Sequence, residues 1–542
     1  MSGFFIKNKN ILLVFIVCVF FALMMLPGIR SPGLWDRDEA YYAEVARQMY
    51  TSNNWLVPGF NNSPFFEKPI FTYWMIAAAY RLFGVSEFSA RIFSVLFSIG
   101  TVILVFFLGK MLFDFRAGYI SALILCTSLF FGIISRVALM DAYFVFFLTG
   151  TLLFFLKTVT PGKNKLLFSI LCFAFAGFAT LTKGPAGVFL PLVTIMVYLA
   201  VTKQLKQLFS LNYFIGILVF VLVAIPWYIS VNKLTGGEFM KEFLFRQNIT
   251  RFFQPAQSHS GPVWFYVPAL FLGFLPWVVF LPQAVYINYR KNRESFYFLA
   301  SWVLVIFVFF SMAATKLPHY ILPLYPALAL LAGKLWSEFM FGSKELRDRI
   351  WATSGISLLL LLFTDIAGLL AVNALLKLSP GVVPWALPVN IGLLFAGNIL
   401  SIVLLMSLKN IKACFYSIIA TVFAFFIFLN ICTIPQLNSQ RVIKPLAEAV
   451  TRQIGEGDDI LAFRFFEPGM VFYTKHFINR TDSISKLNDF VCSEKRVFVF
   501  ISEKDYIEVK NEIKCPIYML YRKEGFSEDK GIMTLFLISN RE

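Results

Sequence analysis

The chain has 542 residues, of which 58% are hydrophobic, and it carries a net charge of +17. Apolar runs of about 20 residues recur along most of its length, which indicates a polytopic helical membrane protein and excludes a β-barrel, whose strands alternate apolar and polar residues. The basic residues lie mostly in short loops between these runs, where the positive-inside rule places them, so the charge does not indicate a nucleic-acid partner.

The first apolar run covers residues 11–26 and resembles a signal peptide, because Lys7 and Lys9 precede it. No small-residue cleavage site follows it before Pro27 and Arg30, so we predict an uncleaved first span with its amino end in the cytoplasm. Twelve further runs bring the predicted number of membrane-spanning helices to thirteen. They cover residues 88–108, 118–134, 142–156, 167–181, 184–201, 213–231, 263–288, 295–313, 319–338, 351–376, 386–407 and 412–431.

Loop charges predict the orientation of these spans, because basic residues are retained on the cytoplasmic side. The loops after the even-numbered spans carry the lysines and arginines, among them Lys110, Lys157, Lys203, Arg290, Lys344 and Lys409. The odd-numbered loops then face outward, and thirteen crossings place the tail outside as well. We therefore predict a transmembrane domain over residues 1–432 and an extracytoplasmic domain over residues 433–542.

The first outer loop, from about residue 30 to 85, contains the sequences WDRDEAYYAEVARQM and FFEKP. From Asp38 onward, apolar side chains such as Tyr42 and Met49 recur at helical spacing, which predicts an amphipathic helix on the membrane surface. A second surface helix is predicted over residues 69–83, whose aromatic residues suit the headgroup layer.

The tail changes character and reads as a small α/β domain. Strands are predicted within residues 458–466, 495–502, 515–521 and 532–539, and helices near residues 468–476 and 504–513. Cys492 and Cys515 lie in this soluble sequence, and they can form a disulfide if the tail is extracytoplasmic. The other five cysteines lie in apolar runs without metal-ligand spacing.

Acidic residues in and near the membrane allow two interpretations. Asp38 and Glu39 begin the predicted surface helix, where its positive end stabilises carboxylates, so they could serve only the helix end. Asp141 lies at the outward mouth of the fourth span, where it could simply pair with Arg136. Asp365 lies deep in an apolar run, and we interpret it as a structural hydrogen-bonding partner of a neighbouring helix.

Basic residues on the predicted outer side fit an anionic ligand. Lys183, Arg246, Arg251 and Lys316 can pair with phosphate, although each could instead extend toward the membrane interface. Glu67 with His259 could hold a divalent metal such as zinc, but no metal-binding spacing supports this. Nucleotide-binding glycine loops are absent, which argues against direct use of ATP or a dinucleotide.

With these residues in view, the chain resembles the GT-C glycosyltransferases of the aminoarabinose lipid A transferase family, relatives of the protein O-mannosyltransferases. The resemblance covers roughly residues 30–335 and rests on six motifs. They are WDRDEAYYAEVARQM, FFEKP, ALMDAYF, TLTKGP, SGPVWFYVP and TKLPHYILPLYPALALL. One departure is a phenylalanine, Phe65 or Phe66, where some members have a tyrosine before EKP.

The resemblance implies roles for particular residues. Asp38 corresponds to the catalytic acid and Asp141 to an assisting acid. The implied substrate-binding residues are Glu39, Tyr42, Lys68, Lys183, Arg251, Lys316 and Tyr320, and the implied metal contacts are Glu67 and His259.

The resemblance further implies an inverting transfer of a sugar, with 4-amino-4-deoxy-L-arabinose expected, from undecaprenyl phosphate to lipid A or lipopolysaccharide. We expect a monomer in the bacterial inner membrane, with a periplasmic active site and no required cofactor, although zinc remains an alternative. Three rival functions stay open: sugar transfer to protein Ser or Thr, transport of a lipid carrier with Asp365 and Asp141 on its path, and a scaffold that binds partners through the tail.

Overall fold

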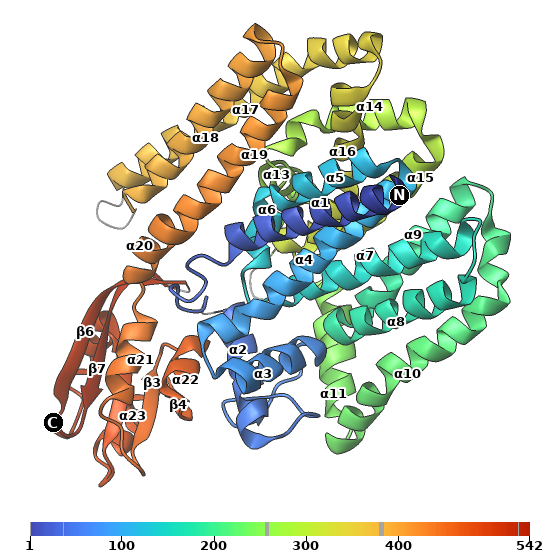
Figure 1. Cartoon of the computed structure of the whole chain (residues 1–542). Helices are drawn as coiled ribbons and strands as arrows, with labels where there is room; N and C mark the ends of the chain where they lie inside the picture. The colour runs from blue at the N-terminus through green and yellow to red at the C-terminus, as the bar shows by residue number, and fades with distance from the viewer. Residues whose placement is uncertain (1, 36, 255–259, 379–383, 529) are drawn as a thin grey trace.

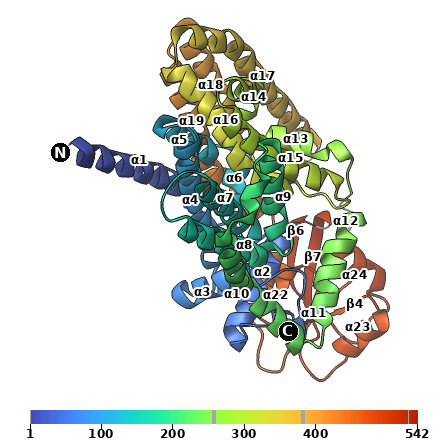
Figure 2. The same ribbon diagram turned by 90° about the vertical axis from the view of Figure 1, so that its right-hand side faces the viewer.

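Long apolar helices form most of the molecule, and a small sheet lies beside one end of them (Figure 1). The computed structural model describes residues 2–35, 37–254, 260–378, 384–528 and 530–542. Figure 2 shows the same arrangement from the side, with the first outer loop and the tail at the same end of the helical bundle.

Eight of the described helices are long and apolar enough to cross a membrane, or up to ten spans if two bent helix pairs are included. The eight are α4 (Glu87–Leu112), α7 (Met140–Val159), α8 (Lys165–Lys183), α10 (Leu211–Leu234), α15 (Arg293–Met312), α17 (Lys344–Leu378), α18 (Ala386–Ile402) with its continuation η6 (Val403–Ser407), and α19 (Ile411–Phe428) with η7 (Leu429–Thr433) and α20 (Ile434–Ser439). The polytopic membrane fold predicted from the sequence is confirmed.

Two predicted spans are broken rather than continuous. Helices α5 (Phe115–Cys126) and α6 (Leu129–Ser135) meet at 67°, where the hydroxyls of Thr127 and Ser128 donate to carbonyls of the preceding turn. The second break separates η3 (Val263–Phe265) and α13 (Tyr266–Gly273) from η4 (Trp277–Phe280) and α14 (Leu281–Lys291) at 105°, next to Pro276.

The remaining predicted spans coincide with three further helical segments. These are α1 (Ser2–Met25), α9 (Ala186–Val201), and η5 (Pro318–Leu324) followed by α16 (Tyr325–Phe341). The short helix η1 (Leu205–Phe209) lies in the connection between α9 and α10. In the membrane region, Asn398 of α18 donates to Asp365 of α17 at 2.5 Å, so the interpretation of Asp365 as a partner of a neighbouring helix is confirmed.

The first outer loop forms α2 (Asp38–Ser52), a two-stranded hairpin of β1 (Gly59–Phe60) and β2 (Ser63–Pro64), and α3 (Phe71–Phe83). Both predicted helices are present. However, α2 packs against α3 and against α22 (Pro468–Thr474) of the tail, so its apolar face is covered by protein. Tyr42, Val45 and Met49 are buried there.

The tail carries a five-stranded sheet in the order β4-β3-β5-β7-β6. Its elements are α21 (Ile443–Thr451), β3 (Asp459–Phe463), α22, β4 (Ile478–Thr481), α23 (Ile484–Val491), β5 (Val497–Ser502), α24 (Glu503–Val509), β6 (Tyr518–Ser527) and β7 (Gly531–Ser539). Strands β4, β3 and β5 are parallel, and β7 joins β5 and β6 antiparallel. The four predicted strands are confirmed, β4 was missed, and a disulfide joins Cys492 to Cys515.

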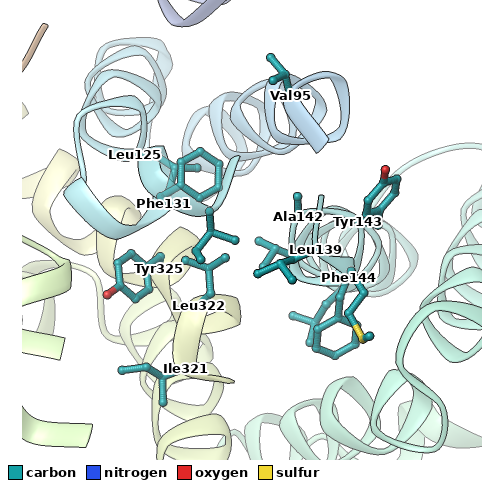
Figure 3. Packing of buried hydrophobic residues seen from close by; sticks show 14 of the residues in the cluster. Val95, Leu125, Phe131, Leu139, Ala142, Tyr143, Phe144, Ile321, Leu322 and Tyr325 are labelled. Atoms are coloured by element: carbon teal, nitrogen blue, oxygen red, sulfur yellow. The ribbon is translucent and has the colours of Figure 1, made fainter. Parts of the chain in front are cut away.

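A dense apolar core supports the start of α7. Figure 3 shows Leu322 of η5 beside Leu139, with Ala142 and Phe144 of α7 behind Leu139, all of them buried. Because interiors pack closely, these contacts fix the first turn of α7 against η5. Asp141 and His319 are therefore presented from two elements that cannot move independently.

Candidate active site

A cavity of about 960 Å³ lies where the first outer loop, the outer ends of several helices and the tail meet. Most of the site residues implied by the sequence line this one cavity, although they come from six separate segments of the chain. They are Asp38, Tyr42, Glu67, Lys68, Asp141, Lys183, Arg251 and Tyr320, joined by His319.

Asp38 is the first residue of α2 and is exposed to the cavity. Its place in the first turn lets the helix dipole stabilise the carboxylate. No hydrogen bond or ion pair joins the Asp38 side chain to any residue in the described part of the chain. The carboxylate is therefore available to a ligand, in the same cavity as Lys68 and Asp141.

Asp141 is buried and pairs with Lys183, whose Nζ lies 2.5 Å from Oδ1. His319 Nε2 lies 3.9 Å from the other carboxylate oxygen. The proposed pairing of Asp141 with Arg136 is wrong, because Arg136 ends α6 and donates to the Pro27 carbonyl at 3.4 Å. Asp141 is therefore paired with a cation from a different helix, and both residues line the cavity.

The end of α8 fixes the position of Lys183. Gly184 follows it with a φ of +67°, a conformation that glycine adopts without cost. A Cβ atom on Gly184 would lie 2.5 Å from Cζ of Phe243, so a larger residue does not fit this turn. The Lys183 ammonium lies 5.2 Å from the ring centre of Phe144 and 5.1 Å from that of Tyr320.

Lys68 lies in the loop between β2 and α3, next to Glu67. Burial lowers the pKa of Lys68, and the positive charge of Arg251 acts in the same direction, whereas Glu67 and Asp38 oppose it. Within the described residues, neither Lys68 nor Arg251 forms an ion pair. Two neighbouring cations in one cavity are an arrangement that a phosphate group would stabilise.

Tyr42 stands edge-on to Tyr73, with 5.7 Å between the ring centres. Burial raises the pKa of Tyr42 well above its usual value, and the negative charge of Asp38 adds to the effect. The Tyr42 hydroxyl therefore stays neutral at physiological pH and can donate a hydrogen bond into the cavity.

Two residues predicted to contact substrate do not line the cavity. Glu39 is fully buried and accepts hydrogen bonds from Arg91 Nε at 2.6 Å and from the Ala138 amide at 2.8 Å. Burial by itself would raise the pKa of Glu39, but the Arg91 guanidinium holds it below the usual value. Lys316 donates to the carbonyls of Ser311 and Ala313, both at 2.7 Å, at the end of α15. Both side chains serve the surrounding structure here.

The predicted metal contacts are only partly visible. Glu67 lines the cavity, whereas His259 lies outside the described residues. Among the residues described, no three His, Cys, Asp or Glu side chains are grouped so as to hold a metal ion. A metal bound by Glu67 stays a prediction, and the chemistry below is derived without one.

Many aromatic side chains also line the cavity, which the charged motifs of the sequence did not indicate. They come from α9, the end of α15, η2 (Lys241–Thr250) and α12 (Arg251–Phe253). These aromatic residues are Phe189, Phe243, Phe245, Phe252, Phe253, Phe309 and Phe310. The tail adds Phe466 and Pro468, and nothing in the sequence indicated that the tail would reach the site.

Comparisons with known proteins support the same assignment of fold. Residues 10–235 match the family of dolichyl-phosphate-mannose-protein mannosyltransferases. The structure superposes on a crystal structure of ArnT from Cupriavidus metallidurans bound to undecaprenyl phosphate with a TM-score of 0.82, covering 98% of both chains at 20% identity. The chain has the GT-C fold.

Sequence relatives extend the likeness beyond the fold. The chain is 32% identical over 321 residues to the undecaprenyl phosphate-alpha-4-amino-4-deoxy-L-arabinose arabinosyl transferase of Yersinia enterocolitica, which is 58% of each protein. It is 30% identical over 375 residues to the transferase of that name from Serratia proteamaculans, or 68% of this chain and 65% of the relative. The match thus spans less than two thirds of either relative. The resemblance of the GT-C motifs to aminoarabinose transferases is confirmed.

Proposed function

We propose that this protein is a membrane glycosyltransferase that moves 4-amino-4-deoxy-L-arabinose from an undecaprenyl phosphate donor to lipid A or lipopolysaccharide. The observation that carries the proposal is the composition of the cavity. Its lining combines the acids Asp38 and Asp141 and the cations Lys68, Lys183 and Arg251 with a group of aromatic side chains. A donor that joins a sugar phosphate to a polyprenyl chain needs both kinds of partner, cations for the phosphate and apolar surface for the lipid.

The cations that line the cavity suit the phosphate leaving group of the donor. As the bond between the anomeric carbon and the phosphate oxygen breaks, negative charge grows on the phosphate, and Lys68 and Arg251 stabilise it. An acceptor oxygen attacks the anomeric carbon from the opposite face, so the configuration inverts.

The role of Asp38 depends on the acceptor. If the acceptor is a hydroxyl, Asp38 takes its proton as the new bond forms. If the acceptor is a phosphate of lipid A, it is already anionic, and Asp38 stabilises the positive charge that develops on the sugar ring. With either acceptor, the Asp141–Lys183 ion pair keeps the charged groups of the cavity in fixed positions.

The loop charges support a multi-pass protein of the bacterial inner membrane with the cavity on the periplasmic face. A donor presented there is already lipid-linked, in keeping with a sequence that lacks nucleotide-binding glycine loops. We propose a monomer as the working unit.

Mass spectrometry of lipid A from cells with and without the protein tests the proposal. We expect a pentosamine mass increment that disappears when Asp38→Asn replaces the wild type. The matched control is Asp458→Asn, since Asp458 lies in a turn of the tail where it accepts from the Gly455 amide. A hexose increment would keep the reaction class and reject the sugar, and unchanged lipid A in all strains would reject the lipid acceptor.

A second candidate is the transfer of a sugar to protein Ser or Thr, favoured by the match of residues 10–235 to the protein mannosyltransferase family. Incubation with a labelled polyprenyl phosphate sugar, followed by separation of lipid and protein fractions, distinguishes the two acceptors. Label in protein would select the second candidate.

A further inference from the structure

The residues that lead into Asp38 connect α1 to α2, and those described, 26–35 and 37, lie outside any helix or strand. We call the described residues 29–35 and 37 the Asp38 segment. Buried backbone amides and carbonyls need hydrogen-bonding partners, and a segment outside helices and strands must find them elsewhere.

Several of these partners come from residues more than 400 positions later in the chain. Asn438 Oδ1 accepts from the Gly33 amide at 2.7 Å, and the Tyr473 hydroxyl accepts from the Leu34 amide at 2.8 Å. Arg441 donates to the Leu34 carbonyl at 2.7 Å and to the Gly33 carbonyl at 3.3 Å. The tail therefore satisfies both amides and carbonyls of the Asp38 segment.

Arg441 and Glu528 extend this contact to the residue before Asp38. The Arg441 side chain is buried, and its NH2 group lies 2.8 Å from Glu528 Oε1. The other oxygen of Glu528 accepts from the Arg37 amide at 3.3 Å. The Arg441 guanidinium also lies 5.1 Å from the ring centre of Trp35. Charge-assisted bonds such as these are stronger and more directional than neutral ones.

The opposite side of the segment is held by α4. Arg91 donates to the carbonyls of Ile29 at 3.0 Å and Pro32 at 2.8 Å, and it is paired with Glu39 of α2. The Asp38 segment is thus clamped between a transmembrane helix and the tail. On the tail side, the contacts continue to the Arg37 amide.

We infer that Arg441 and Glu528 are positioning residues for the transfer reaction. They act through the Asp38 segment and hold the Asp38 carboxylate in register with Lys68 and Asp141 across the cavity. The inference rests on the proposed function. A displacement of a reacting group by about 1 Å can lower a rate about 10²-fold, so loss of this hold has a catalytic effect even in a folded protein.

The main test is the kinetics of purified Arg441→Ala in lipid nanodiscs. We expect kcat to fall at least about 10-fold while KM for the donor changes less than about 2-fold, because Lys68 and Arg251 lie outside the Asp38 segment. The matched control is Arg522→Ala, since Arg522 lies in β6 of the tail and pairs with Glu503 at 3.2 Å, with the Arg522 side chain exposed. This control should retain wild-type kinetics. A variant whose kcat per folded molecule is unchanged would overturn the inference.

A double variant separates positioning from simple anchoring of the tail. If Arg441 acts through Asp38, Asp38→Asn with Arg441→Ala is no slower than Asp38→Asn alone. A multiplicative loss would overturn the inference. Should Arg441→Ala fail to fold, Glu528→Gln keeps the size of the side chain while removing the ion pair, and the same comparison applies to it.

Amide hydrogen exchange tests the contact without relying on activity. We expect the amides of the Asp38 segment to exchange faster in Arg441→Ala and unchanged in Arg522→Ala. Unchanged exchange in Arg441→Ala overturns the inference whether or not sugar transfer is observed. A wild-type protein with protected amides but no transfer would reject the proposed function alone.

Discussion

The Asp141 carboxylate lies between the Lys183 ammonium at 2.5 Å and the His319 ring at 3.9 Å. Removing either member of such a buried pair leaves the other charge uncompensated, which costs about 3–5 kcal/mol. We therefore expect Asp141→Asn and Lys183→Met each to lower the transfer rate about 10²–10³-fold. The double variant should be no slower than the less active of the two single variants. Initial rates with a labelled donor measure this.

The control for the Asp141 prediction is Lys334→Met, because Lys334 is also paired, with Glu338 at 2.8 Å, but does not line the cavity. It should retain transfer. If Lys183→Met raised only KM for the donor, Lys183 would be a phosphate contact whose pairing with Asp141 has no catalytic consequence.

Lys68 predicts a pH dependence of donor binding. Burial and the charge of Arg251 lower the pKa of Lys68, so its ammonium loses its proton at a lower pH than an ordinary lysine near 10.4. Phosphate affinity is therefore present below this lowered pKa and is lost as the pH rises through it. Titration of undecaprenyl phosphate binding across the alkaline range measures the effect.

Lys68→Arg is the control for the pH prediction, since a guanidinium stays charged throughout that range. Its affinity should stay level where that of the wild type falls. Equal slopes in both proteins would show that another group causes the alkaline loss.

At the scale of elements, the turn between α8 and α9 links an apolar contact to the position of Lys183. In Gly184→Ala, the new Cβ would meet Phe243 at 2.5 Å and the residue would keep a φ of +67°. We expect a loss of stability of about 1–3 kcal/mol and lower transfer, because either the Phe243 ring or the end of α8 must move. Thermal unfolding in detergent and transfer rates measure both effects.

Gly392→Ala is the matched control, because Gly392 lies in α18 with a negative φ and open space around its Cα. It should be neutral or slightly stabilising. Combining Gly184→Ala with Phe243→Ala removes the steric part, so the double variant should recover some stability. No recovery would assign the whole effect to the backbone.

The sequence predicted elements that have strong local signals. The period of α2 and the short apolar runs of β5 and β7 are visible in their own residues, whereas β4 is only four residues of mixed polarity, INRT. The breaks next to Pro276 and at Thr127 were missed because the apolar runs continue through them. Hydrophobicity reports membrane depth, and it does not report where a helix bends.

The candidate site was likewise predicted only in part. Asp38, Lys68, Asp141 and Lys183 belong to charged motifs in an apolar chain, and the structure brings them to one cavity. The burial of Glu39 against Arg91 could not be foreseen, because it depends on a residue 52 positions away on α4. Phe466 was likewise invisible, since a phenylalanine in a soluble domain usually serves its own core.

At the scale of the whole molecule, the tail is both a folded unit and a wall of the cavity. The disulfide between Cys492 and Cys515 closes a loop with a sequence separation of 23. Replacing both cysteines with serine should destabilise the tail by about 3 kcal/mol, since the unfolded tail gains freedom. Because the tail supplies Phe466 and holds the Asp38 segment, transfer should decline with it.

Thermal unfolding and transfer should be measured together on the cysteine variant. Replacement of Cys172, which is buried in α8 far from the tail, serves as the control and should leave the unfolding of the tail unchanged. If transfer stayed at the wild-type rate while the tail was unfolded, the tail would have no role in catalysis.

The tail contacts of the Asp38 segment can form only late in the synthesis of the chain, because the partners lie far apart in the sequence. Gly33 leaves the ribosome 405 residues before Asn438, and Arg37 leaves it 491 residues before Glu528. At about 5–20 residues per second, roughly half a minute to a minute and a half passes before the last of these partners exists. If the proposed positioning role holds, a nascent chain already inserted in the bilayer gains transfer activity only after Glu528 has been synthesised and the tail has folded against the Asp38 segment.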